Sequence, residues 1–315
     1  MPNFKQINNF GEHAVDQFGF IDQCHQKNLK TALVTIVGII GRASRKLGAH
    51  MVVCEDGTYA GSVSSGCIDG NVVALALDAI ETGQSKRVQF GEGSPFVDVK
   101  LPCGGGVDLL ILPMPDADVV RNFLDQLMRR ETVSLELSEA GISMAVREAR
   151  DEIFQFTYEP KIRLCLAGRG LELLQFCRTA AAADFEIISY TPDGADRDAC
   201  AAFGEAFQLS AIGDVNNLKA DQWTAIILLF HEHEWEPPLL EQALATDAFY
   251  VGALGSKVTH EARIEALKLR GIDQASLDRL HGPIGLVPSM RNASMLAIST
   301  LAEIIDHFQR RRSNG

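Results

Sequence analysis

Residues 164–176 of this chain read LCLAGRGLELLQF. A short apolar run ends at two closely spaced glycines, Gly168 and Gly170, and a stretch with apolar residues at helical spacing follows. This order predicts a strand, a tight turn and a helix. Further along the chain strands and helices alternate, which is typical of βαβ units on a parallel sheet. A glycine turn directly after the first strand then favours a Rossmann-like domain.

The part of the chain before residue 158 is richer in short strands and predicts a small α+β domain. Asp56-Gly57 is a two-residue hairpin signal, and Gly83 is a C-cap signal for a helix that begins at 68. The fold class is therefore α/β, with an N-terminal α+β domain at 1–157 and a C-terminal Rossmann-like parallel-sheet domain at 158–315. Strands are expected at 33–37, 51–54, 58–60, 87–90, 97–101, 107–112, 133–137, 143–147, 153–156, 162–167, 185–190, 206–209, 225–230 and 248–251, and the remaining helices at 119–129, 171–182, 195–203, 238–245 and 258–269.

Composition excludes several classes of protein. The 315 residues carry 29 Lys and Arg against 41 Asp and Glu, a formal charge of −12, which disfavours binding to nucleic acid. No apolar run approaches the ~20 residues of a membrane span, and the first residues lack the layout of a secretory signal. The seven cysteines form no CxxC pair, so neither a disulfide framework nor a zinc ribbon is indicated. We expect a cytoplasmic protein with reduced thiols.

The glycine turn at Gly168 departs from the dinucleotide fingerprint at two positions. Leu173 stands where a third small residue normally lets helix and strand pack closely. Tyr190 ends the second strand, where an acidic residue would bind the ribose, and Asp193 comes three residues later. NAD(P) is therefore not expected. A scaffold without a dinucleotide and a site for another nucleotide or a pterin phosphate both fit this pattern.

Two further segments follow strands of the same domain. Gly252, Gly255 and Ser256 precede a helix whose free N–H groups could meet an anion, although a plain capped helix gives the same pattern. His231 and His233 follow the strand at 225–230. Contact with a substrate is favoured there over a metal, because no third ligand is indicated by spacing; a solvated turn is the remaining alternative.

The N-terminal domain has its own glycine loops. Ser62, Gly66 and Cys67 lead into a helix, so the loop is a second candidate anion site, and the helix dipole would lower the pKa of the Cys67 thiol. Cys103 precedes Gly104 and Gly105, a setting typical of an exposed, ligand-binding or reactive thiol.

Other residues of interest have simpler alternatives. Cys165 and Cys177 lie within expected core elements and are interpreted as structural. Arg42, Arg45 and Lys46 form a basic cluster in an acidic chain. They are either a solvated loop or a clamp on a phosphate group.

Seven segments in this order resemble the XdhC/CoxI family, the accessory proteins of molybdenum hydroxylases such as xanthine dehydrogenase. They are RASRKLGAHM (42–51), DGTYAGSVSSGCID (56–69), CGGGVDLLI (103–111), FHEHE (230–234), YVGALGS (250–256), GPIGL (282–286) and AISTLAEII (297–305). The resemblance runs from about Thr31 to about Ile305. It departs from the family pattern at Ser44, at Asp69, at Phe230 and after GPIGL, where the chain continues VPSMRNAS.

The resemblance implies an insertion chaperone rather than an enzyme. Such a protein binds the molybdenum cofactor, molybdopterin, as cargo and delivers it to the apoenzyme of a molybdenum hydroxylase. A cysteine desulfurase that sulfurates the cofactor is a further partner in some systems, and a homodimer is compatible with the pattern. The expected cofactor contacts are Cys67, Cys103, Gly104, Gly105, Ser62, Gly66, Arg45, Gly168, Gly170, His231, His233, Gly252, Gly255 and Ser256, with Cys103 a candidate molybdenum contact.

Two alternatives come from other classes of protein. An NAD(P)-dependent oxidoreductase would use the Rossmann-like domain, but the altered fingerprint disfavours it and no acid–base set is identifiable. A protein-interaction subunit without a small ligand would leave the glycine-rich anion sites unexplained.

Overall fold

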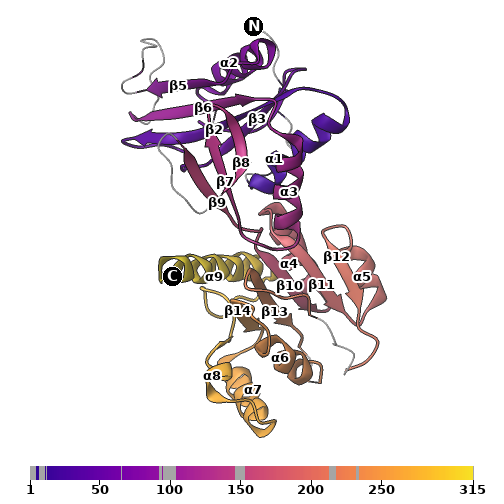
Figure 1. Ribbon diagram of the computed structural model, residues 1–315. Helices are drawn as coiled ribbons and strands as arrows, with labels where there is room; N and C mark the ends of the chain where they lie inside the picture. The colour runs from indigo at the N-terminus through magenta and orange to yellow at the C-terminus, as the bar shows by residue number, and fades with distance from the viewer. Residues whose placement is uncertain are drawn as a thin grey trace. The chain divides into compact units, whose positions relative to one another are not determined.

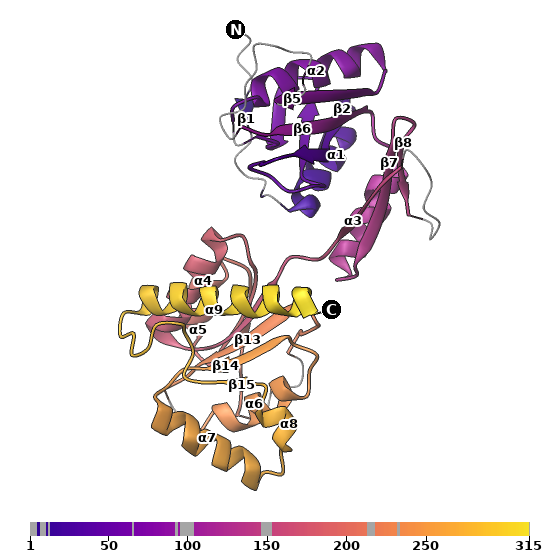
Figure 2. The same ribbon diagram turned by 90° about the vertical axis from the view of Figure 1, so that its left-hand side faces the viewer.

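The computed structural model describes residues 5–6, 11, 13–64, 66–91, 94, 104–145, 153–212, 218–231 and 234–314. The chain forms two compact units, Met1–Pro160 and Lys161–Gly315 (Figures 1 and 2). This division falls three residues beyond the boundary expected after residue 157. No helix among the described residues is long and apolar enough to cross a membrane.

The N-terminal unit is built on a six-stranded sheet of order β1-β4-β3-β2-β6-β5. β1 pairs with β4 in parallel, and the other pairs are antiparallel. The strands are β1 (Lys5–Gln6), β2 (Thr31–Ile40), β3 (His50–Cys54), β4 (Thr58–Gly61), β5 (Lys86–Gly91) and β6 (Gly106–Pro113). A smaller sheet of order β8-β7-β9 consists of β7 (Val133–Ser138), β8 (Gly141–Met144) and β9 (Phe154–Tyr158).

Alternation along β2 explains the layers of this unit, because successive side chains of a strand point to opposite faces. Val34 and Ile36 pack in one core with α2 (Asp69–Thr82). Leu33 and Val37 pack in another with α1 (Ala14–Gln26), α3 (Ala117–Met128) and the small sheet. Figure 2 shows α2 and α1 on opposite sides of the six-stranded sheet.

The C-terminal unit has a parallel sheet of order β12-β11-β10-β13-β14-β15. Numbered from β10, this is the doubly wound order 3-2-1-4-5-6 of a Rossmann fold. The prediction of a C-terminal Rossmann-like domain is confirmed, but the N-terminal unit, Met1–Pro160, is not the smaller of the two. The strands are β10 (Arg163–Gly168), β11 (Glu186–Thr191), β12 (Glu205–Gln208), β13 (Thr224–Leu229), β14 (Tyr250–Ala253) and β15 (Leu280–His281).

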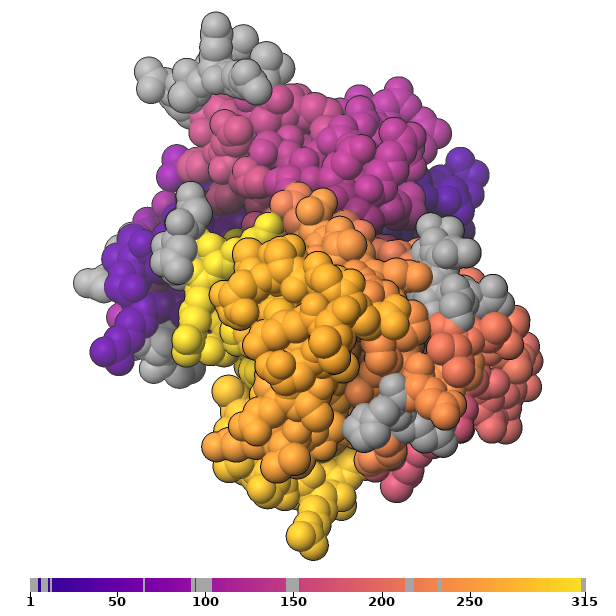
Figure 3. Space-filling view, turned by 90° about the horizontal axis from the view of Figure 1, so that it is seen from below, coloured from indigo at the N-terminus to yellow at the C-terminus, as the bar shows by residue number. Residues whose placement is uncertain are grey.

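Helices cover both faces of this sheet. One face packs against α4 (Gly170–Ala182), α5 (Gly194–Cys200) and the long helix α9 (Ala293–Asn314). The other packs against α6 (Glu236–Leu244), α7 (Lys257–Leu269) and α8 (Gln274–Leu277). Figure 3 shows the outer surface of this second layer in orange. Cys165 and Cys177 are fully buried in these two cores, as expected for structural cysteines.

Three expected strands differ from the structure or cannot be compared with it: one is shifted along the chain, one begins earlier, and one lies outside the described residues. The strand expected at 248–251 is β14 at Tyr250–Ala253, so Gly252 lies inside the strand and not in the loop after it. The strand expected at 143–147 begins earlier, at Gly141, whose positive φ (132°) forms the β7–β8 turn. The strand expected at 97–101 lies outside the described residues. The sixth strand, β15, was not predicted, because two residues carry no periodic signal.

Candidate functional site

The loops singled out in the N-terminal domain meet at one end of the six-stranded sheet. β2 ends opposite the start of β6, with Ile40 beside Gly106, and β4 ends beside the start of β3, with Gly61 opposite Met51. We call this the glycine-loop end (residues 41–49, 62–64, 66–68 and 104–105). Val63, Ile68 and Val107 share one buried core here, and Ala43 packs against it.

A carboxylate fixes the loop before α2. Asp69, only 5% exposed, accepts hydrogen bonds from the hydroxyls of Ser62 and Ser64, both at 2.6 Å. Ser64 Oγ in turn accepts from the Ile68 N–H at 3.0 Å. Ser62 therefore shapes the loop, and Cys67 is left exposed, with its thiol 3.0 Å from the Ser64 carbonyl oxygen.

The second glycine loop is held by backbone contact. A Cβ on Gly105 would lie 2.1 Å from the Arg42 carbonyl oxygen, so only glycine lets this loop approach the end of β2. Gly104 and Gly66 differ: both have positive φ, and open space surrounds the Cβ that each lacks. The glycine-loop end thus joins two open glycines, one exposed thiol and the segment that carries Arg42 and Arg45. Cys103 lies outside the described residues.

In the C-terminal unit the expected ligand edge forms where β10 and β13 end side by side, the point at which the strand order reverses. A Cβ on Gly168 would lie 2.7 Å from Leu229 Cβ, so this glycine permits the close approach of the two strands. His231 follows β13 with its side chain 68% exposed, and its Nε2 lies 3.5 Å from Glu172 Oε1 in the first turn of α4. His233 lies outside the described residues.

At this edge a carboxylate of the protein itself lies where a bound anion would be expected. The Gly170 N–H, at the start of α4, donates to the carboxylate of Asp196 at 2.6 Å. In dinucleotide-binding proteins the corresponding N–H groups face the pyrophosphate. A phosphate would have to displace this carboxylate against its negative charge. Sequence reasoning missed Asp196, because nothing in its surroundings marks it as a partner of Gly170.

The two positions that depart from the fingerprint, Leu173 and Tyr190, and the late acidic residue Asp193 have structural roles. Leu173 is fully buried in the core that joins α4 to the sheet. Tyr190 is 6% exposed, and its hydroxyl accepts from the Lys219 N–H at 3.3 Å. Asp193 caps α5 by accepting from the N–H groups of Ala195 and Asp196.

The segment from Gly252 to Ser256 also has a structural explanation. Gly252 is buried, and a Cβ there would lie 2.6 Å from the Tyr250 ring, so the close approach expected for a ligand is made by a side chain of the protein. Ser256 caps α7 by accepting from the Thr259 N–H at 3.1 Å. Gly255 is exposed with φ 151°, which leaves it as the accessible glycine of this turn.

A buried ion pair fixes α7 behind that turn. Arg263 donates to both carboxylate oxygens of Glu236 at 2.8 and 3.1 Å, and to the Leu254 carbonyl at 2.7 Å. Both side chains are 4% exposed. Arg263 thereby connects α7, the start of α6 and the end of β14.

Comparison with known proteins gives consistent matches. Residues 164–304 match the family described as XdhC Rossmann domain, and residues 24–91 match the XdhC and CoxI family. The chain is 34% identical over 278 residues to the molybdenum cofactor insertion chaperone PaoD of Escherichia coli K12, covering 86% of this chain and 81% of that protein.

Two further matches are more distant. The uncharacterized protein YqeB of Escherichia coli K12 is 22% identical over 89% of this chain, which spans 44% of that protein. A crystal structure described as a xanthine dehydrogenase from Bacillus halodurans superposes with a TM-score of 0.77 at 18% identity, covering 94% of this chain and 96% of that one. The second likeness shows a shared fold.

Proposed function

This chain belongs to the XdhC and CoxI family, and we propose that it binds the molybdenum cofactor as cargo and delivers it to a molybdenum hydroxylase of the xanthine dehydrogenase type. The 34% identity to a molybdenum cofactor insertion chaperone, over most of both chains, carries this proposal. An insertion chaperone binds and releases its cargo without chemical conversion, so no acid–base set is required.

The glycine-loop end offers the groups that such a cargo needs. Arg42 and Arg45 can pair with the pterin phosphate, since guanidinium groups recognise phosphate in a bidentate manner. Gly66 and Gly104 leave open space in which a flat ring can approach the backbone. Cys67 is exposed, and thiolates are preferred ligands of soft metal centres. We infer that Cys103, which the sequence places directly before Gly104, contributes a second thiol.

The edge of the Rossmann sheet supports a ligand other than a dinucleotide. Asp196 holds the N–H at which a pyrophosphate would bind, and we infer that NAD(P) is not a ligand. His231 and Gly255 remain accessible for contact with the cargo or the client enzyme. The cytoplasmic location, the cysteine desulfurase partner and the homodimer stay predictions from the sequence.

Deletion of the gene in a host that makes a molybdenum hydroxylase tests the proposal. The hydroxylase polypeptide is expected at normal abundance but without molybdenum, and re-expression of this chain should restore the metal. The chain purified from a cofactor-producing host should carry pterin and molybdenum. A full molybdenum complement in the hydroxylase of the deletion strain would refute the delivery role.

A further inference from the structure

One cluster of metal-ligating side chains lies outside the sites described above. It joins His281 at the end of β15 to Glu303 and His307, which are four residues apart on α9. Residues at this spacing project from the same face of a helix. One ligand atom from each residue lies within 4.8 Å of the others, and all three side chains are partly buried.

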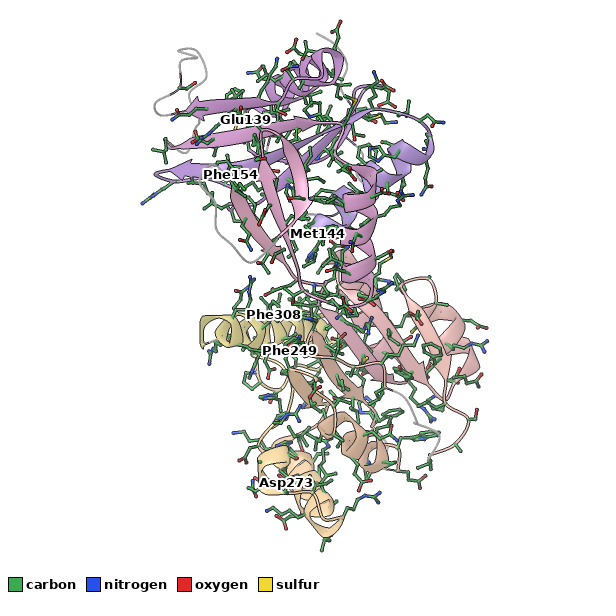
Figure 4. The ribbon with its side chains drawn as sticks, in the orientation of Figure 1. Glu139, Met144, Phe154, Phe249, Asp273 and Phe308 are labelled. Carbon is green, nitrogen blue, oxygen red and sulfur yellow. The ribbon has the colours of Figure 1, made fainter. Side chains whose placement is uncertain are left out.

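Aromatic packing places the two imidazoles. The His281 ring stacks on Tyr250 with centroids 4.6 Å apart and planes 6° apart, and it meets the His307 ring edge-on at 4.3 Å. Gly252 makes room for the Tyr250 ring, which a Cβ at that position would strike. Next to His307, Phe308 packs on Phe249 at 5.3 Å between centroids, which fixes α9 beside β14 (Figure 4).

A supporting layer orients the carboxylate. The Gly285 N–H donates to Glu303 Oε2 at 2.5 Å, which orients this carboxylate. One turn earlier on the helix, Ser299 Oγ accepts from the Val287 N–H at 2.8 Å. The GPIGL segment is thus bound to the α9 face that carries Glu303 and His307. Ligating carboxylates in metal sites are commonly held by such outer hydrogen bonds.

A buried polar atom belongs to the ring on which His281 stacks. Tyr250 is 1% exposed, and its hydroxyl makes no hydrogen bond of good geometry with the described residues. A buried hydroxyl without a partner is unfavourable, and a water held by a bound ion would supply one.

We propose that His281, Glu303 and His307 bind a divalent transition-metal ion of the zinc class. Two imidazole nitrogens and one carboxylate oxygen suit zinc, cobalt or nickel, whereas magnesium and calcium prefer oxygen ligands alone. Three atoms within 4.8 Å of one another have a common point at most about 2.8 Å from each. Small side-chain movements therefore reach the ~2.0–2.1 Å of zinc–nitrogen and zinc–oxygen bonds.

The residue types of the cluster separate it from the proposed cargo site. No thiolate belongs to the cluster, which separates this ion from the molybdenum of the proposed cargo. The bound ion links α9 to β15 and so connects an outer helix to the last strand of the sheet.

Titration of the metal-free full-length protein with Co²⁺ and Zn²⁺ tests the site. We expect one equivalent of Co²⁺ to give visible d–d absorption without a thiolate charge-transfer band, and Zn²⁺ to displace it and raise the unfolding temperature. Glu303→Gln and His307→Asn should each weaken binding at least about tenfold. Asp306→Asn, which removes an exposed charge from the same helix, should leave the affinity within about twofold of the unmodified protein.

Three results would overturn the proposal: no saturable binding of one equivalent, a thiolate band, or unchanged affinity in both ligand variants. Circular dichroism without metal shows whether each variant is folded. If one variant is unfolded, the metal affinity of the other variant tests the site. The cobalt spectrum of the unmodified protein tests it without any variant. Cargo delivery can fail or succeed independently, since these assays involve neither the cofactor nor the hydroxylase.

Discussion

His50 Nε2 lies 2.7 Å from the hydroxyl oxygen of Tyr158, so a partly buried hydrogen bond joins the start of β3 to the end of β9. On its other side His50 Nδ1 lies 2.8 Å from Thr35 Oγ1 on β2. Burial, and next the charge of Lys46, lower the pKa of His50 to about 3. The six-stranded and three-stranded sheets are therefore joined by a neutral imidazole.

This linkage predicts loss of stability in acid. Between pH ~6.5 and ~3 the unfolded chain binds a proton at His50 that the folded chain does not, so the free energy of unfolding falls as pH falls. The slope from this one group is about 1.4 kcal/mol per pH unit. Urea unfolding of the protein and of His50→Gln at pH 7 and pH 5 should show a steeper loss for the unmodified protein. Parallel losses would contradict the assignment.

Breaking the buried pair of Arg263 and Glu236 should be costly. Glu236→Gln leaves a guanidinium in a site where both side chains are 4% exposed, and loss of one partner from such a pair costs about 3–5 kcal/mol. Denaturant unfolding measures this change. The double variant Glu236→Met with Arg263→Met should recover much of the loss, because no uncompensated charge stays buried. A single variant within about 0.5 kcal/mol of the parent would show that the pair is unimportant.

The Asp196 contact predicts the absence of tight NADH binding. Fluorescence titration of the purified protein should give no saturable change at micromolar NADH or NADPH, because a carboxylate holds the Gly170 N–H and Leu173 is a packing residue. Micromolar affinity would instead favour the oxidoreductase alternative.

Cys67→Ala should lower cofactor retention and leave the unfolding temperature nearly unchanged, since the exposed thiol contributes little packing. Cys177→Ala is the matched control: its thiol is fully buried, so this variant should lose about 1 kcal/mol or more while retaining cofactor. The two variants are compared by thermal melting and by molybdenum content after purification. The sequence predicts the same result for Cys103→Ala, namely lower cofactor retention with a nearly unchanged unfolding temperature. Normal cofactor content together with a lowered melting temperature would show that the replaced thiol has a structural role.

The two described glycines after Cys103 should respond differently to alanine. Gly104→Ala meets open space and is expected to cost about 1 kcal/mol through its positive φ. Gly105→Ala places a methyl group 2.1 Å from the Arg42 carbonyl and should cost clearly more. Equal unfolding free energies would mean that the loop can move away from β2.

The regular elements were largely predictable because local signals decide them. The alternation of apolar strands and helices from β10 to α7 sufficed for the Rossmann topology, and Asp56-Gly57 marked the β3–β4 hairpin. Gly252 was assigned to a ligand loop because a sequence cannot show that a neighbouring aromatic ring requires the missing side chain.

The contacts of Asp196 and the cluster at His281 could not be predicted for a related reason. Asp196 meets Gly170 across 26 residues of sequence, and nothing in the chain around Asp196 marks it as a partner of that glycine turn. His281 comes beside Glu303 and His307 only after β15 has paired with β14 and α9 has packed on the sheet. Spacing rules detect ligands on one element, whereas this set is divided between a two-residue strand and a helix.

The position of α9 affects the order in which the chain can fold. β10 is the first strand of its sheet to be synthesised, yet Leu164 and Leu166 share their core with Leu296, Leu301 and Ile304. These partners emerge from the ribosome more than a hundred residues later. The N-terminal unit can complete its cores during translation, while the part of the second sheet that α9 covers stays open to solvent. The nascent C-terminal half is thus exposed to aggregation until α9 has been synthesised.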